Sequence, residues 1–75
     1  MTSHILDLHG IRHYEVDLIV ENFVFLNQEE MPLTIICGNS EKMLSLVRNV
    51  LERSNAEYFN GSGHEYGLIK VHRLK

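Results

Sequence analysis

The sequence is poor in the features that mark several large classes of protein. It has 75 residues, with one cysteine, one proline and no tryptophan. The lone Cys37 excludes an intrachain disulfide and is typical of a reducing compartment. No apolar stretch approaches the roughly 18 residues of a membrane span. The start, Met1 to His4, has no basic segment followed by an apolar one. We therefore expect a cytoplasmic protein with neither an export signal nor a membrane segment.

The length and composition indicate one small folded unit. Apolar residues make up 44% of the chain and charged residues 23%, which is typical of a globular protein rather than a disordered one. We find no internal repeat, low-complexity tract or linker. A chain of this size has room for one hydrophobic core, with a radius of gyration of roughly 11 Å. We expect a single domain over residues 1–75.

Basic residues are scarce over most of the chain. Residues 1–67 hold ten acidic against four basic residues, a net charge of −6, whereas residues 68–75 hold three basic residues and no acid. Between Tyr14 and Met31 every charged residue is acidic. Such a segment repels a phosphate backbone. Any nucleic-acid site must therefore lie elsewhere on the surface.

The spacing of apolar residues predicts six elements in the order β-α-β-α-β-β. Alternation with period two predicts strands, and recurrence at three and four residues predicts helices. The predicted strands are residues 4–9, 33–37, 57–60 and 68–74, and the predicted helices are residues 14–27 and 41–54. Either Asn39 or Ser40 can cap the second helix. Residues 61–67 form a glycine-containing loop.

Each predicted helix has a stripe of apolar residues that we expect to face the core. The first stripe is Val16, Ile19, Val20, Phe23 and Leu26. The second is Met43, Val47, Val50 and Leu51, flanked by Leu44. In the first helix, Leu18 and Phe25 widen the stripe. Our interpretation of this pair is a wide core, and the alternative is a surface for self-association or a protein partner.

This element order predicts an α/β (α+β) two-layer sandwich. Short β-α units place neighbouring strands in parallel, with right-handed connections and both helices on one face. The last two strands can pair as an antiparallel hairpin, which makes the four-stranded sheet mixed. The other face of the sheet is then left open.

Chemistry is expected beyond the carboxyl ends of the parallel strands. Asp7 and His9 lie there, on one face of the first strand, at a spacing of roughly 6.6 Å that is too long for a direct hydrogen bond. His9 can serve as a general acid or base, and Asp7 can orient a histidine, position water or hold a divalent ion. We expect the backbone N–H groups at Asn39 and Ser40, where the second helix begins, to form a phosphate-binding site. The purely structural alternative is a carboxylate that caps a turn and a histidine bonded to backbone.

The block Leu6-Asp7-Leu8-His9-Gly10 in this element order resembles the Smr (small MutS-related) domain over nearly the whole chain. The resemblance implies a fold like the C-terminal domain of bacterial translation initiation factor three, with strand order 1-2-4-3 and an antiparallel fourth strand. It also implies binding of DNA or RNA, and nicking endonuclease or ribonuclease activity in which Asp7 and His9 are the catalytic pair. The resemblance does not fix a cofactor, and the candidates are Mg²⁺ and Mn²⁺.

The second signature of that family departs from its usual His-Gly-x-Gly turn. Only Gly38 is retained, because Cys37 and Ser40 occupy the positions of the histidine and the second glycine. The predicted nucleic-acid contacts are Gly10, Arg12, Gly38, Asn39, Ser40 and Lys42. Glu41 places a negative charge beside them, and Lys42 compensates in part. The departure favours an alternative function, a binding or adaptor module without catalysis.

Other side chains with reactive groups fit simpler interpretations. Histidine and Cys37 suggest zinc, but the spacings typical of zinc ligands are absent. Cys37 ends a buried strand, which predicts an inert thiol. His64 is interpreted as a solvated loop residue. Lys70 and His72 share one face of the last strand with Leu68 and Leu74, where they either extend a basic strip across the open sheet face or are simply exposed.

Overall fold

The structure is a computed structural model that describes residues 4–74. Its elements are β1 (Ile5–Asp7), α1 (His13–Leu26), η1 (Gln28–Glu30), β2 (Leu33–Ile36), α2 (Glu41–Arg53), β3 (Ala56–Asn60), η2 (Gly63–Glu65) and β4 (Leu68–Leu74). Apart from the short 3-10 helices η1 and η2, this is the predicted β-α-β-α-β-β order. Within the described residues, neither α-helix has the length and apolar character needed to cross a membrane.

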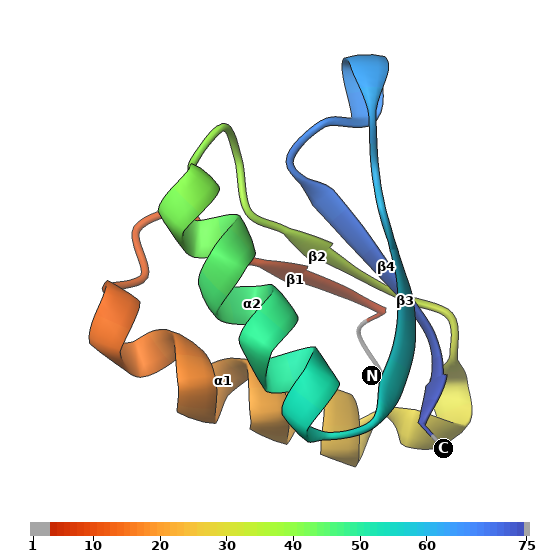
Figure 1. Cartoon of the computed structure of the whole chain (residues 1–75). Coiled ribbons are helices and arrows are strands. Elements are labelled where there is room, and N and C mark those ends of the chain that lie inside the picture. The colour runs from red at the N-terminus through yellow and green to blue at the C-terminus, as the bar shows by residue number, and fades with distance from the viewer. Residues whose placement is uncertain (1–3, 75) are drawn as a thin grey trace.

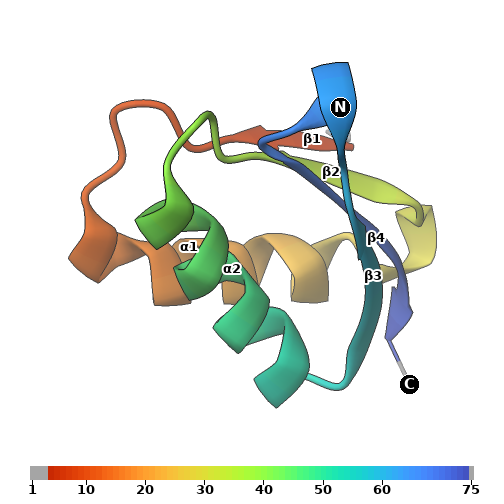
Figure 2. The same ribbon diagram turned by 45° about the horizontal axis from the view of Figure 1, so that its top comes forward.

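The four strands form one mixed sheet in the order β1-β2-β4-β3. β1 and β2 run parallel, and β4 runs antiparallel to both of its neighbours. Both α-helices cover the same face of this sheet (Figures 1 and 2). The predicted two-layer sandwich, its mixed sheet and the antiparallel fourth strand are therefore confirmed.

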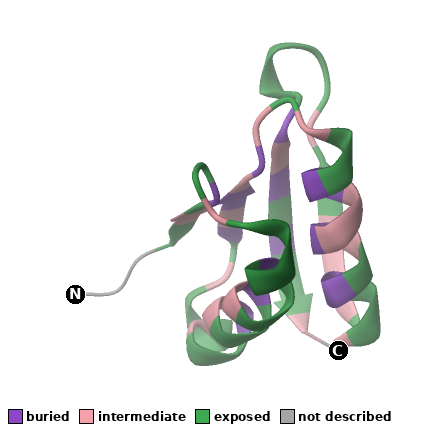
Figure 3. Ribbon diagram, turned by 90° about the vertical axis from the view of Figure 1, so that its left-hand side faces the viewer, coloured by how far each residue is buried: buried purple, intermediate pink, exposed green. Residues whose placement is uncertain are grey.

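The core lies between the helices and the sheet. The stripe of α2 is buried as predicted, and its buried positions face the sheet (Figure 3). The fully buried strand residues are Leu33, Ile35, Ile69 and Val71. In α1 the buried residues are Val16, Val20 and Val24. The prediction for α1 was wrong at Leu26, which is 77% exposed, because the buried row runs from Val16 in steps of four to Val24, and Leu26 lies about 160° from Val24 around the helix axis.

The Leu18 and Phe25 side chains are exposed, so their interpretation as core residues was wrong. At about 100° per residue, both positions lie close to 180° from Val16 around the axis of α1. Tyr14 lies on the same side of the helix, and it is also exposed. Helix α1 thus presents an apolar row to solvent on the side opposite the core.

The sheet face that carries no helix is open, as expected, but its edge is irregular. A register shift pairs Glu57 with Arg73 and Tyr58 with Val71, so His72 is the extra residue of a β-bulge in β4. His72 and Arg73 are consecutive exposed residues, and Leu74 turns back to pack against the core. The prediction that Leu74 shares a face with Lys70 and His72 was therefore wrong at this bulge.

Candidate active site

Asp7 and His9 are bonded directly at the end of β1. Oδ1 of Asp7 lies 2.6 Å from Nδ1 of His9 and also accepts a hydrogen bond of 2.9 Å from the His9 backbone N–H. The predicted separation was wrong because β1 ends at Asp7 instead of His9. The chain then turns, with the Ile11 N–H donating to the Leu8 carbonyl at 3.1 Å, and this turn brings His9 back to Asp7.

The pair is open to solvent, with side-chain exposures of 69% for His9 and 56% for Asp7. The backbone N–H of His9, and then its ring, lower the pKa of Asp7 below the usual 3.8 by hydrogen bonding to the carboxylate. Asp7 is therefore ionised at neutral pH. An ionised partner requires Nδ1 to carry the proton of a neutral imidazole, which leaves Nε2 with a free lone pair.

The Nε2 atom of His9 lies beside Gly38, at the end of β2. A Cβ atom added to Gly38 would come within 3.2 Å of Nε2, so the two predicted glycine turns do lie side by side. Gly38 has a φ of 72°, in the left-handed region that favours glycine. The absence of a side chain lets the Gly38 backbone lie close to Nε2, the ring nitrogen that Asp7 does not hold.

Gly67 supports the Gly38 turn from its other side, and the sequence interpretation missed it. A Cβ atom on Gly67 would come within 2.6 Å of the Gly38 carbonyl oxygen. The Gly67 carbonyl accepts a hydrogen bond of 2.7 Å from the Cys37 N–H. The only signal in the sequence was a glycine directly before the last strand, which gave no indication of this contact.

The backbone N–H groups at the start of α2 are already partly hydrogen-bonded within the protein. Ser40 caps the helix, as one of the two predicted caps, by accepting a hydrogen bond of 3.1 Å from the Met43 N–H. Glu41 begins the helix, and its carboxylate accepts a hydrogen bond from the Tyr66 hydroxyl. This bond raises the pKa of Tyr66. A carboxylate at this position weakens the attraction of the helix N-terminus for a phosphate.

The remaining residues that were predicted to contact nucleic acid lie around this end of the sheet and do not bind to a common residue. Gly10 and Arg12 lie between β1 and α1, whereas Asn39 and Lys42 lie at the start of α2. The loops that follow β1 and β2 emerge at the same end of the sheet (Figure 2). Within residues 4–74 the side chains of Arg12, Asn39 and Lys42 have no hydrogen-bond or ion-pair partner. Their polar groups are therefore available to a ligand.

The alternative chemistries based on cysteine and metal lack a suitable site. Cys37 is buried, and this burial raises the pKa of its thiol to about 11. The predicted burial of Cys37 is confirmed, and a thiol with that pKa is a poor nucleophile. Among residues 4–74, no group of three or more His, Cys, Asp or Glu side chains is arranged to hold a metal ion. His64 is exposed in η2, as predicted.

The structure thus defines an α+β two-layer domain with an exposed aspartate-histidine pair beside a glycine turn. The sequence matches no protein-family model and no curated protein, and the fold matches no solved structure. Function must therefore be argued from the site and from the block Leu6 to Gly10.

Proposed function

We propose that this chain is a nucleic-acid-binding domain of the Smr type that cleaves phosphodiester bonds with His9 and Asp7. The observation that carries the proposal is the 2.6 Å contact between Asp7 Oδ1 and His9 Nδ1 at an exposed strand end. The resemblance of residues 6–10 to the first Smr signature supports the same pair. The exposure of both side chains suits a polymer substrate, which cannot enter a closed pocket.

In this proposal His9 moves the proton and Asp7 positions His9. Asp7 accepts a hydrogen bond from the Nδ1–H group, which fixes the tautomer and the ring orientation. Nε2 then takes the proton of the attacking hydroxyl as its oxygen bonds to phosphorus and the bond to the leaving oxygen breaks. The resulting imidazolium, stabilised by the Asp7 carboxylate, returns the proton to that leaving oxygen. A positioned acid-base group of this kind contributes about 10² to 10⁴ in rate.

The scissile phosphate would contact Nε2 from the solvent side, next to the Gly38 turn. Arg12 and Lys42 are exposed cations on the loop and helix that flank this space, and Asn39 adds an amide. A protein-held metal is not part of the proposal, because Asp7 lacks further carboxylate or histidine ligands beyond His9 among the described residues. We therefore derive no step through Mg²⁺ or Mn²⁺.

A second candidate function is a binding module without catalysis. It is favoured by the Ser40 cap and the Glu41 carboxylate, which occupy the start of α2 where a phosphate would otherwise bind. The apolar row of Tyr14, Leu18 and Phe25 on α1 provides a surface for a protein partner or a second copy of the chain. This module would retain the fold and bind through α1.

The experiment is a cleavage assay on supercoiled plasmid and on single-stranded RNA, each with and without Mg²⁺ or Mn²⁺. We expect His9→Ala and Asp7→Asn to lose at least about 100-fold in rate. The control is His64→Ala, which removes an exposed histidine of η2 outside the pair and should leave the rate unchanged. Cleavage by a doubly substituted Asp7→Ala, His9→Ala protein at the wild-type rate would refute the catalytic assignment. Binding without cleavage by the wild type would favour the second candidate.

A further inference from the structure

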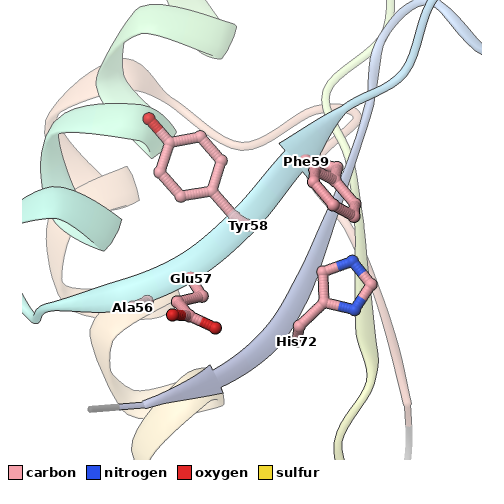
Figure 4. A pocket seen from close by; sticks show the side chains of 5 residues that line it. All are labelled: Ala56, Glu57, Tyr58, Phe59 and His72. Carbon is pink, nitrogen blue, oxygen red and sulfur yellow. The ribbon is translucent and has the colours of Figure 1, made fainter.

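The open face of the sheet carries an exposed aromatic ring near its edge. Phe59 lies within β3, and its side chain is 67% exposed. Figure 4 shows Phe59 and His72 on one side of the sheet, whereas Tyr58 points toward α2. The Phe59 and His72 rings meet edge to face, with centroids 4.5 Å apart and an angle of 71° between their planes. Despite this contact, most of the Phe59 side chain stays open to solvent and to a ligand.

One cation that is unpaired within residues 4–74 lies beside this ring. Lys70 is directly opposite Phe59 in the β3-β4 pairing, and it has no hydrogen-bond or ion-pair partner among the described residues. The bulge adds His72 and Arg73 on the exposed side of β4, where Nε of Arg73 is bonded to Glu57 at 2.8 Å. A free lysine beside an exposed ring is complementary to a ligand that is both anionic and aromatic.

A shallow depression of about 310 Å³ adjoins the Phe59 ring, with Leu68, Lys70 and Asn60 in its lining. The volume lies at the lower end of the range for small-molecule sites. Its apolar floor and the Asn60 amide suit a flat heteroaromatic group. Glu65 and Lys70 both line the depression, and Lys70 is the partner for a phosphate because Glu65 repels an anion.

We propose that this face binds single-stranded nucleic acid, with one unpaired base stacked on Phe59 and a neighbouring phosphate paired with Lys70. The inference rests on the proposed function and specifies the form of its substrate. A base paired within a duplex has no free face to stack, whereas an unpaired base does. Duplexes therefore gain nothing from Phe59.

The position of Phe59 relative to Asp7 supports a continuous path for one single-stranded nucleic acid across the sheet. The register of the sheet aligns Ile5 with Thr34, Thr34 with Lys70 and Lys70 with Phe59. Asp7, two residues beyond Ile5, shares its face of β1. Three strand spacings separate β1 from β3, a distance of roughly 14 Å. One single-stranded nucleic acid that crosses the open face can thus contact both Phe59 and His9.

The test uses the absence of tryptophan from the chain. In the variant Phe59→Trp, the fluorescence of the only tryptophan should be quenched when a short oligouridylate binds, because the base stacks on the indole. The matched control is Phe25→Trp on α1, whose parent residue is equally exposed at 64%. We expect no quenching in that variant.

Binding is measured in parallel by fluorescence anisotropy of a labelled oligouridylate and of an RNA duplex. Phe59→Ala should weaken binding of the single strand roughly 5- to 150-fold, which corresponds to one stacked base, and Phe25→Ala should not. Lys70→Ala should reduce the slope of log K against log salt by about 0.7. Duplex binding should be unaffected by Phe59→Ala.

The outcomes separate this inference from the proposed function. If the wild type binds the single strand and Phe59→Ala binds it equally well, the inference is overturned while the proposed function stands. If the wild type binds neither single strand nor duplex, both proposals fail. Quenching of Phe59→Trp that depends on protein concentration without oligonucleotide would identify a second copy of the chain as the occupant and overturn the inference.

Discussion

Nε2 of His9 lies 3.2 Å from the position that a Cβ atom on Gly38 would occupy. This relationship joins the ends of β1 and β2, and it favours glycine at position 38, because a Cβ atom there would push the His9 ring away by a few tenths of an ångström. The opposite ring nitrogen is held by Asp7. His9 is thus held by the Asp7 carboxylate on one side and packs against the Gly38 backbone on the other.

The first prediction concerns Gly38→Ala. The control is Gly63→Ala, because Gly63 also has a positive φ, of 62°, but a Cβ atom there would meet nothing within 4 Å. Both variants should lose about 1 to 2 kcal/mol of stability through backbone strain. Only Gly38→Ala should also displace the His9 ring, which ¹⁵N NMR spectra of the imidazole would report.

Urea unfolding measures the stability of both variants. Identical imidazole spectra in the wild type and in Gly38→Ala would contradict the proposed packing of His9 against Gly38. A spectral change in Gly63→Ala would show that the readout is not specific to this contact.

The second prediction is a pH dependence set by Asp7. Because the pKa of Asp7 is lowered in the folded chain, its carboxylate contributes stability above the usual pKa of 3.8, and this contribution is lost as the pH falls through the folded pKa. Asp7→Asn should therefore be less stable than the wild type near neutral pH, and the difference should narrow in acid. Thermal unfolding from pH 7 to pH 2 measures it. A difference that widens in acid would contradict the assigned hydrogen bonds.

The third prediction concerns the Cys37 thiol. Burial raises its pKa from 9.0 to about 11, so at pH 8 the thiolate fraction is about 100-fold below that of a free cysteine. Alkylation by iodoacetamide should be slower than that of a free cysteine by at least this factor, and urea should restore the ordinary rate. Stability should fall as the pH rises from 9 toward 11, because the unfolded thiol loses its proton first. Rapid alkylation of the folded protein would contradict this account.

Most of the fold could be predicted from the sequence because its elements have clear periods and short connections. The strand Leu33 to Ile36 and the helix stripe from Met43 to Leu51 are apolar at the spacing that their structures require. The parallel pairing of β1 and β2 then follows from the helix between them. The end of β1 could not be predicted, because it depends on a hydrogen bond that the His9 N–H donates to the Asp7 side chain, which leaves no trace in the apolar periodicity.

The sequence predicted which residues come together at the candidate site, but not the direct contacts between them. Asp7, His9 and Gly38 do come together, because the carboxyl ends of parallel strands meet. Their direct contacts depend on a turn at His9, which local alternation could not predict. Phe59 was missed for a related reason, since the face on which an edge-strand residue lies depends on a pairing partner distant in the sequence.

The fourth prediction concerns the outer row of α1. Leu18→Ala and Phe25→Ala should each change stability by less than about 0.5 kcal/mol, because both side chains are exposed and lie opposite the core. The control Val20→Ala, at a fully buried position, should lose on the order of 2 kcal/mol. Urea unfolding measures all three. A large loss for Leu18→Ala would mean that this surface is buried, as it would be in an oligomer.

Light scattering over a range of protein concentrations distinguishes the two uses of this surface. A mass that rises with concentration in the wild type, and not in a Leu18→Glu, Phe25→Glu variant, would assign the row to self-association. A constant mass equal to that of one chain would exclude self-association and leave a separate protein partner as the occupant.

The central claim is that the His9 imidazole transfers the proton during phosphodiester cleavage. Chemical rescue tests it most directly, because a small base can replace a missing imidazole only where that group takes part in the reaction. The account predicts that His9→Gly cleaves single-stranded RNA or plasmid at least about 100-fold more slowly than the wild type and that added imidazole restores a large part of the rate. Wild-type cleavage by His9→Gly without imidazole would contradict it, as would a loss that imidazole leaves unchanged.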